Sequence, residues 1–291
     1  MKKKISRRSF FKKIAFSSLT LFSLSYGGYF YARFIEPRRL DITEIEIEHT
    51  LIPPSFQGMK ILQFSDTHIG FQYDPAMLLN HVETINSLQP DIVLFTGDLL
   101  DEPNQYDDIE KIISILKMIK APFGKFAIYG NHDHGGYGTD IYERVMRNSG
   151  FTLLKNESKV ISMIDQSKIY IAGVDDLILG KPDIHATLRS IPNEQFTILL
   201  AHEPDFANQL PKHRIHLQLS GHSHGGQIRL PFIGALYTPP YAEKYQDGQY
   251  YIPLQKMTLY VNRGIGTTRL PFRFLAVPEI TIFTLTSKTS P

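Results

Sequence analysis

Five short segments of this chain have the character of buried strands, and each ends abruptly in polar residues. Apolar runs of this length between turn residues are typical of strands inside a sheet. Helical spacing of apolar residues separates the first three segments, and alternation of this kind predicts a parallel sheet with ligand sites at the carboxyl ends of its strands. The segments are residues 59–65, 91–96, 125–129, 196–201 and 217–220, and the separating helices are predicted at 75–88 and 107–120.

The second half of the chain predicts a different order of secondary-structure elements. After a helix at 139–149, short strands follow one another without long helices, which suggests a second, mainly antiparallel sheet packed on the first. An alternating segment at 40–48 predicts a half-exposed edge strand. We therefore expect an α/β fold with two packed mixed β-sheets flanked by helices. The remaining elements are strands at 151–154, 160–164, 169–174, 258–261 and 276–285, and a helix near 184–190.

The polar residues after the five segments are two carboxylates, an asparagine and five histidines. Taken one at a time, these residues do not indicate a site, because an acidic turn or a lone histidine is more often a core or surface residue than a ligand. The loop from Tyr129 to Gly136 is the densest, and taken alone it could equally be a polar turn. Their joint occurrence just past buried strands predicts one shared site. The residues are Asp66 and His68, Asp98, Asn131 and His132, His202, and His222 and His224.

The amino-acid composition limits the kinds of ligands and nucleophiles that such a site can contain. The chain has no cysteine, which excludes disulfides, thiolate metal ligands and cysteine nucleophiles. Seven of its 31 basic residues and none of its 29 acids lie in residues 1–32, so the remainder carries a net charge of −5. A mildly acidic body argues against a nucleic-acid polymer as the partner. A hydrophobic content of 42% indicates a globular protein with a sizeable core.

Residues 1–36 are predicted to be a targeting segment, followed by one domain over residues 37–291. The segment Ser6-Arg7-Arg8-Ser9-Phe10-Phe11-Lys12 precedes an apolar run and resembles a twin-arginine export signal. An amphipathic N-terminal helix is the alternative. At about 18 residues, the run is either cleaved or kept as a membrane anchor. Both outcomes place the domain outside the cytoplasm, at the cell wall or on the outer face of the cytoplasmic membrane.

The polar clusters resemble the pattern of the calcineurin-like metallophosphoesterases: D-x-H, G-D-x-x-D, G-N-H-[DE], a lone H and G-H-x-H. The resemblance covers about residues 59–285 and is strongest to the twin-arginine-exported bacterial phosphodiesterases, through Tyr129–Gly136 and Val261–Gly266. It implies a four-layer α/β/β/α sandwich. The matching residues are Asp66-Thr67-His68, Gly97-Asp98-Leu99-Leu100-Asp101, Gly130-Asn131-His132-Asp133, His202 and Gly221-His222-Ser223-His224.

The resemblance also implies roles for these residues. Two divalent ions would share Asp98 as a bridging ligand, and nitrogen and oxygen donors without sulfur suit Mn²⁺, Zn²⁺ or Fe. His132 would be the general acid for the leaving oxygen, with Asp101 orienting and charging its imidazole. The implied ligands are Asp66, His68, Asp98 and His224 for one ion, and Asp98, Asn131, His202 and His222 for the other.

The function implied is an exported phosphoesterase that hydrolyses phosphodiester or pyrophosphate bonds with metal-activated water. Its substrate would be a cell-wall polymer, a lipid head group or a nucleotide, and its other partner the twin-arginine export machinery. A non-catalytic metal-binding scaffold at the cell envelope and a phosphomonoesterase are the alternatives. Protein phosphatases of this family carry an arginine after G-D-x-x-D, where this chain has Glu102-Pro103.

Several residues near the motifs keep two interpretations. His134 could touch substrate, but a solvated loop histidine is favoured, and Asp175-Asp176 is interpreted as a turn. Arg263 and Arg269 either clamp a phosphate or make structural pairs. The segment Leu230–Tyr251 either walls the site, faces a membrane or simply packs. The remaining histidines show no recognisable spacing and are predicted at the surface: His49, His81, His185, His213 and His216.

Overall fold

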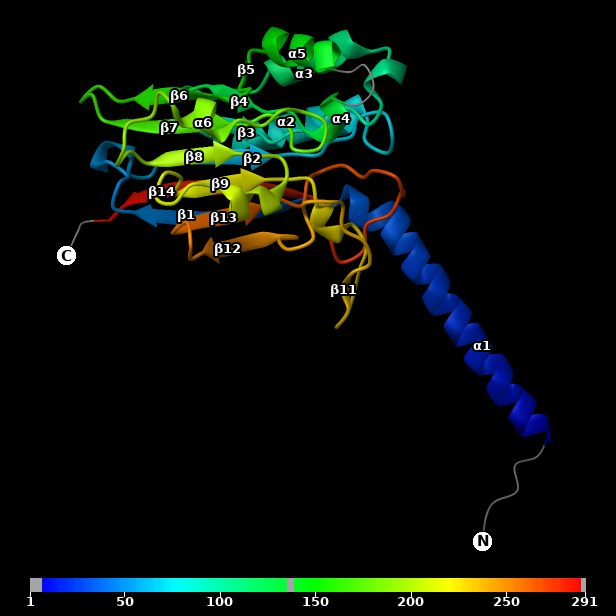
Figure 1. Ribbon diagram of the computed structural model, residues 1–291. Helices are drawn as coiled ribbons and strands as arrows, with labels where there is room; N and C mark the ends of the chain where they lie inside the picture. The colour runs from blue at the N-terminus through cyan, green and yellow to red at the C-terminus, as the bar shows by residue number, and fades with distance from the viewer. Residues whose placement is uncertain (1–6, 135–138, 289–291) are drawn as a thin grey trace.

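A computed structural model of the protein describes residues 7–134 and 139–288 of its 291. Residues 2–4 and Ser6 of the predicted export signal, and Gly135-Gly136 of the glycine-rich loop, lie outside the described residues. Two six-stranded sheets pack face to face, and helices lie on their outer faces (Figure 1). The architecture is mixed α/β, as the sequence predicts.

The first sheet is mostly parallel. Its strand order is β1-β14-β2-β3-β4-β5, with β2 to β5 parallel, β14 antiparallel to β2, and β1 parallel to β14 at the edge. The prediction of an edge strand at 40–48 is therefore confirmed. The strands are β1 (Asp41–His49), β2 (Lys60–Phe64), β3 (Ile92–Phe95), β4 (Lys125–Ala127), β5 (Thr152–Leu153) and β14 (Glu279–Ser287).

The second sheet is mixed, as the predicted fold class has it, but the expectation that its strands are mainly antiparallel was wrong. In the order β12-β13-β9-β8-β7-β6, the inner strands β7, β8, β9 and β13 are parallel, and only the two outer pairings are antiparallel. Crossover connections between β7, β8 and β9 carry short helices, as parallel neighbours require. The strands are β6 (Glu157–Ser162), β7 (Lys168–Gly173), β8 (Thr197–Leu200), β9 (Leu217–Ser220), β12 (Gly248–Ile252) and β13 (Met257–Val261).

Helices α2 (Pro75–Ser87), α3 (Ile109–Lys117) and α5 (Thr139–Asn148) cover the outer face of the first sheet. α2 starts where the sequence predicts, because the Asp74 side chain accepts the Met77 N–H at 2.9 Å and Pro75 takes the first helical position. Helix α6 (Ile184–Leu188) and the 3₁₀ turn η5 (Pro204–Gln209) cover the second sheet.

The central strands are apolar on both faces because each face is covered. In β2, Ile61 packs between the two sheets, whereas Leu62 packs under the helices of the first sheet. In β8, Ile198 packs between the sheets and Leu199 under the outer layer of the second. This double burial explains why the strands read as continuous apolar runs rather than as alternating ones.

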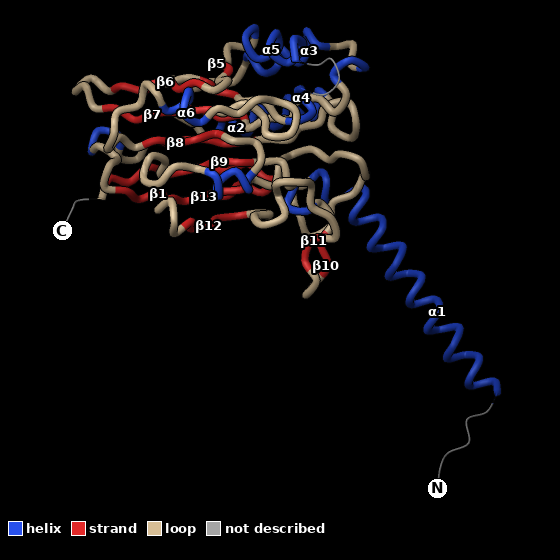
Figure 2. The backbone as a smooth tube through the Cα atoms, viewed as in Figure 1, coloured by secondary structure: helices blue, strands red, loops and turns tan. Residues whose placement is uncertain are grey.

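A long helix, α1 (Arg7–Phe30), leads away from one end of the sandwich (Figures 1 and 2). The end of α1 and the π-helical turn η1 (Tyr31–Ile35) after it join the body: the Tyr29 and Phe272 rings lie 5.5 Å apart, and the Arg273 N–H donates to the Ala32 carbonyl at 2.9 Å. Glu36 is fully buried and accepts the Ala276 N–H at 2.6 Å. Among the described residues, none of the helices has both the length and the hydropathy needed to cross a bilayer.

Three histidines predicted at the surface are half-buried. His81 Nδ1 lies 2.6 Å from the Tyr73 hydroxyl, and His216 stacks on Phe196 with ring centroids 5.6 Å apart. His49 packs beside His216. Burial lowers the pKa of His81 to about 4; burial, with His49 and His213 nearby, lowers that of His216 to about 4. His49 packs against Phe196 and His216, which are distant in sequence, so spacing alone does not reveal its burial.

Candidate active site

All five polar clusters meet at one edge of the sandwich. β2, β3 and β4 are parallel in one sheet and β8 and β9 are parallel in the other, so the residues after them converge. Backbone bonds hold the loops together: the Asp66 N–H donates to the Gly97 carbonyl at 2.9 Å, and the Gly221 N–H to the His202 carbonyl at 3.0 Å. Asn131 opens a short helix, α4 (Asn131–His134).

Five of the predicted ligands hold their backbone in the left-handed region, where residues other than glycine are uncommon. Such conformations cost free energy and persist only where the surroundings impose them, often at functional sites. The residues and their φ angles are Asp66 (52°), His68 (44°), Asp98 (61°), His222 (68°) and His224 (52°).

Two motif glycines allow the loops to approach one another closely. A Cβ on Gly130 would overlap the Asp98 carboxylate, and a Cβ on Gly221 would overlap Ser65 and the Asp66 carboxylate. In both cases the obstructing atoms are buried and belong to the site itself. The motif therefore needs glycine at these positions because no side chain fits beside the carboxylates.

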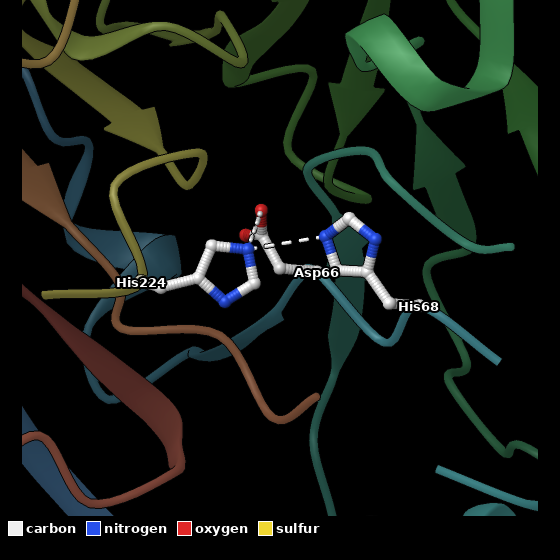
Figure 3. Close-up of side chains that lie close together, drawn as sticks. All are labelled: Asp66, His68 and His224. Atoms are coloured by element: carbon white, nitrogen blue, oxygen red, sulfur yellow. Dashed lines mark hydrogen bonds and ion pairs between the residues drawn. The ribbon is translucent and has the colours of Figure 1, made fainter. Parts of the chain in front are cut away.

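One group of ligands contains Asp66, His68 and His224, whose ligand atoms all lie within 4.8 Å of one another (Figure 3). His68 Nε2 and His224 Nε2 are 3.1 Å apart, and His224 Nε2 is 3.5 Å from Asp66 Oδ1. All three side chains are buried. Two imidazole nitrogens and a carboxylate oxygen converging in this way could hold a divalent cation.

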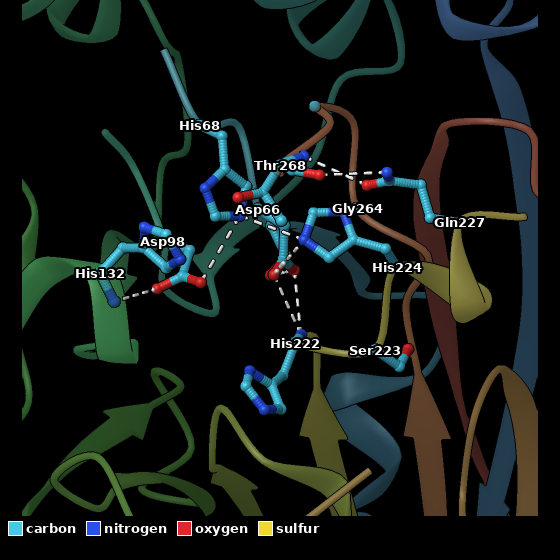
Figure 4. Close-up of polar contacts among 12 residues, drawn as sticks. Asp66, His68, Asp98, His132, His222, Ser223, His224, Gln227, Gly264 and Thr268 are labelled. Carbon is cyan, nitrogen blue, oxygen red and sulfur yellow. Dashed lines mark hydrogen bonds and ion pairs between the residues drawn. The ribbon is translucent and has the colours of Figure 1, made fainter. Parts of the chain in front are cut away.

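A second group contains Asp98, His202 and His222. His202 Nε2 lies 3.2 Å from Asp98 Oδ2, and the His202 and His222 rings are 4.9 Å apart. The same Asp98 oxygen is 3.5 Å from His68 Nε2 in the first group. Figure 4 shows Asp98 between His68 and His132, with its other oxygen accepting the His132 N–H at 2.9 Å. Asp98 therefore connects the two groups.

Two histidines are held in tautomers that leave one ring nitrogen free, and a third faces a carboxylate. His202 Nδ1 donates to the Thr96 carbonyl at 2.6 Å, so Nε2 is left as a ligand atom. His222 Nε2 donates to the Pro240 carbonyl at 3.0 Å, so Nδ1 is left instead. His68 Nδ1 lies 3.1 Å from the Asp101 carboxylate and directs Nε2 inward. Partners of this kind orient metal-binding imidazoles in proteins.

The residues fit a cation on two further observations. Among the described residues, Asn131 Oδ1 is a buried polar atom without a hydrogen-bond partner, and such an orphan is costly unless an ion or water meets it. Burial, with the neighbouring His202, lowers the pKa of His222 to about 3, so its imidazole is neutral and can offer a lone pair. Oxygen and nitrogen donors suit borderline divalent ions.

The Asp101 carboxylate lies closer to His68 than to His132. Its carboxylate is 3.9 Å from His132 Nδ1, whereas it lies 3.1 Å from His68 Nδ1 and accepts the Thr268 hydroxyl at 2.8 Å. His132 Nδ1 instead donates to the Asp101 backbone carbonyl at 2.8 Å. The carboxylate thus orients His68, and the carbonyl orients His132. The difference arises because the loop turns the Asp101 side chain towards β2, which the motif spacing does not reveal.

Asp133 organises the backbone beneath the site. Its carboxylate accepts the N–H groups of Asp98 (2.8 Å), Leu99 (3.0 Å) and Gly130 (2.9 Å). Burial and the charge of Asp98 raise the pKa of Asp133 to about 7, although the three donors oppose the rise. For Asp98 itself, burial opposes ionisation, but His202 and His132 outweigh it and hold its pKa well below the ordinary value.

His134 is not the solvated loop histidine that the sequence favours. Its side chain is 9% exposed, Nε2 lies 2.6 Å from Asp175 Oδ1, and the ring packs 4.6 Å from that of Tyr129. The pair ties α4 to the end of β7. Asp175-Asp176 forms a turn as predicted, because the Asp176 carboxylate accepts the Ile178 N–H at 3.0 Å.

Arg263 and Arg269 have different surroundings in the structure. Arg263 makes structural pairs, at 3.4 Å with both Asp41 and Glu279. Arg269 is exposed at the rim of the site, where its guanidinium lies over the Tyr237 ring. A phosphate clamp therefore remains open for Arg269 alone.

Residues of the last loop were missed by sequence reasoning. Arg273 is fully buried and donates to the carbonyls of Arg263 (2.9 Å) and Gly264 (3.1 Å), which line the back of the site. Gln227 binds both backbone groups of Thr268, at 3.1 Å each, and so joins two walls (Figure 4). No motif includes these residues, although Val261–Gly266 and Arg269 marked the loop and Gln227 directly follows Gly226.

A cavity of about 330 Å³ opens over the cluster. Its deep end is lined by buried residues such as His68 and Asp98, together with Asn131 and His132. Its outer wall is apolar: Leu236, Tyr237 and Leu270 are exposed, and Ile228 and Pro239 are half-buried. The cavity can therefore receive a charged group at its base and an apolar group at its mouth.

Known proteins of similar sequence or structure supplement this description of the site. Residues 59–226 match the family model of the calcineurin-like phosphoesterases. The Bacillus subtilis protein named uncharacterized metallophosphoesterase YkuE is 49% identical over 98% of this chain and 99% of its own length. The UDP-2,3-diacylglucosamine pyrophosphatase LpxG of Chlamydia muridarum is 27% identical over 87% of this chain and 91% of its own. The crystal structure of TT1561 of Thermus thermophilus has a TM-score of 0.44 and 13% identity, covering 72% of this chain and 90% of its own.

Proposed function

Because the chain belongs to the calcineurin-like phosphoesterase family, we propose that it is an exported hydrolase of phosphodiester or pyrophosphate bonds with two divalent metal ions. The position of Asp98 carries this proposal. Its Oδ2 lies 3.5 Å from His68 Nε2 and 3.2 Å from His202 Nε2, so one oxygen faces both groups of ligands. A two-metal site needs a carboxylate in this place.

The ligand sets would be the two that the family motifs imply, with Asp98 common to both. Mn²⁺, Zn²⁺ or Fe would suit these donors. Divalent ions in such a site supply a Lewis acid that activates water and offsets the charge of the phosphoryl oxygens. His132 lines the cavity, and its Nδ1 is engaged by the Asp101 carbonyl. Its Nε2 is then the atom that would pass a proton to the leaving oxygen.

Three observations support a diester or pyrophosphate with an apolar part as the substrate. Glu102-Pro103 stands where protein phosphatases of this family carry a phosphate-binding arginine. The outer wall of the cavity is apolar, with Leu236 and Leu270 beside the opening. The relative LpxG is named for a pyrophosphatase activity on a diacylated sugar nucleotide. Lipid head groups fit these features better than wall polymers or free nucleotides.

The test is a substrate panel with protein reconstituted with Mn²⁺, Zn²⁺ or Fe²⁺. Bis(p-nitrophenyl) phosphate should exceed p-nitrophenyl phosphate in kcat/KM by at least about tenfold, and an acylated UDP-sugar should exceed UDP-glucose by a similar factor, as apolar contacts allow. Faster turnover of the monoester would favour the phosphomonoesterase. Loaded metals without turnover of any member would favour the non-catalytic scaffold.

Export is supported by Arg7 and Arg8 at the start of α1. Replacing both with lysine keeps the charge but removes the pair of guanidinium groups, and an ammonium group is not chemically equivalent to a guanidinium. Arg7→Lys with Arg8→Lys should hold the protein in the cytoplasm, as measured by cell fractionation, whereas the control Arg33→Lys should not. Unchanged export of the double variant would contradict the twin-arginine route.

A further inference from the structure

A small hairpin near the mouth of the cavity exposes two large apolar side chains at its tip. The hairpin pairs β10 (Arg229–Leu230) with β11 (Gly234–Ala235). Phe232 is fully exposed at 109% and Ile233 is 72% exposed. Phe232 also holds a left-handed φ of 66°, which a bulky residue rarely adopts. The aromatic ring is therefore exposed to solvent on a backbone conformation that costs free energy.

The apolar surface is continuous from the tip to the site. Leu236 and Tyr237 follow β11, are more than half exposed, and belong to the outer wall of the metal-site cavity. Ile228, just before β10, lines the same cavity and also a hollow shared with Tyr29 and Phe272 beside the end of α1. The hairpin and α1 both project away from the sheets on the same side of the sandwich (Figures 1 and 2).

Cations and aromatic rings accompany this surface. The Arg269 guanidinium lies 5.7 Å from the centre of the Tyr237 ring, and the Arg33 guanidinium lies 5.0 Å from that of Phe34. Arg38 and Arg39, which follow α1, are exposed. Arginines next to aromatic and aliphatic side chains are typical of protein surfaces at the level of lipid head groups, where anionic lipids attract them.

The shape of the hairpin favours a bilayer over a protein partner. A stable protein interface covers about 800 Å² on each side and needs a complementary surface. A convex tip with two apolar side chains offers little such area, but it can enter the boundary between head groups and acyl chains, where no fixed shape is required.

We propose that the β10–β11 hairpin is a docking surface for an anionic phospholipid bilayer, with Phe232 and Ile233 inserted between the lipids. Docking brings the mouth of the cavity to the level of the lipid phosphates, while the metal ligands stay at its base. The docking proposal depends only on the geometry of the hairpin. The idea that the head group of a docked lipid is the substrate rests on the proposed function.

The chain contains no tryptophan, so a single introduced indole reports its own surroundings. Phe232→Trp in the full-length protein is to be mixed with vesicles of phosphatidylcholine and phosphatidylglycerol. Its emission should shift to shorter wavelength, and lipids brominated on the acyl chain should quench most of it. The control is Ile164→Trp, because Ile164 is equally exposed at 101% in the β6–β7 turn and lies off the hairpin; its emission should stay unchanged.

Three outcomes would overturn the proposal: no vesicle binding, vesicle binding through α1 while the Phe232→Trp indole stays in water, or a shift that grows with protein concentration without lipid, which would indicate a second copy of the chain. Phe232→Ser with Ile233→Ser should weaken vesicle binding by at least about tenfold, as loss of two buried apolar side chains implies. These measurements use no turnover, so they succeed or fail separately from the proposed reaction. Rates on the soluble diester in this double variant should match wild type and show that the site is intact.

Discussion

Asp98→Asn should abolish metal binding and hydrolysis together, lowering kcat/KM by at least about 10³-fold, beyond the 10–100-fold cost of losing an outer partner of a metal ligand. Asp98 uses both oxygens: Oδ1 accepts the His132 N–H at 2.9 Å, and Oδ2 lies between His68 and His202. An amide has one acceptor oxygen. Whichever way it turns, its NH₂ group faces either that N–H or the cation. Metal content by mass spectrometry and diester turnover, measured on one preparation, check this.

A matched control is Asp74→Asn, the same chemical change at the start of α2. There the side chain only accepts the Met77 N–H, and asparagine caps a helix about as well as aspartate. This variant should keep metals and turnover. The apo form of Asp98→Asn should unfold below the temperature of the apo wild type, because the pairing with His202 and His132 that holds the pKa of Asp98 well below its ordinary value is lost. Normal metal content with wild-type turnover in Asp98→Asn would refute the bridging role.

The place of the site could be predicted from the sequence because it depends on local rules. Each predicted strand is a short apolar run, and parallel strands bring their carboxyl ends to one edge. Asp66, Asp98 and Asn131 therefore had to lie near one another once β2, β3 and β4 were recognised. His202 and His222 join them because β8 and β9 are parallel too, although a mainly antiparallel sheet was expected there. That expectation placed the residues correctly for an incomplete reason.

What the sequence could not show depends on long-range contacts. The side of the loop to which Asp101 turns is set by Thr268, far along the chain, whose hydroxyl donates to its carboxylate at 2.8 Å. Arg273 reaches the back of the site only because its loop folds under the residues after β13. His134 is buried because Asp175, at the end of β7 in the other sheet, faces it. Sequence spacing carries no trace of such pairs.

His132→Asn should keep the metals and lose the transfer of a proton to the leaving oxygen. We expect kcat to fall by about 10²–10⁴-fold on an alkyl ester, which needs an acid, and by less than about tenfold on a p-nitrophenyl ester, which does not. Metal content and KM should stay near wild type. Equal losses on the two esters, or a loss of metal, would contradict the general-acid role.

The pH dependence gives a second check on His132. Burial opposes its charge, but Asp98, together with the carbonyl and the carboxylate of Asp101, outweighs burial, so the pKa of His132 lies above its ordinary value. The acid form therefore persists towards alkaline pH. For the alkyl ester, the wild-type rate should fall as the pH rises through that pKa, and the His132→Asn profile should lack this alkaline limb. The p-nitrophenyl ester, which needs no acid, should show the limb only weakly in wild type and not at all in the variant.

Asp101→Asn separates the two roles considered for that carboxylate. If the carboxylate served to charge His132, this variant would repeat the leaving-group pattern of His132→Asn. The structure predicts otherwise, because the backbone carbonyl that holds His132 Nδ1 survives the substitution, whereas the partner of His68 Nδ1 changes. Metal affinity should then fall by about 10–100-fold. At saturating metal, the ratio of rates on the two esters should equal that of wild type, since the proton still comes from an oriented His132.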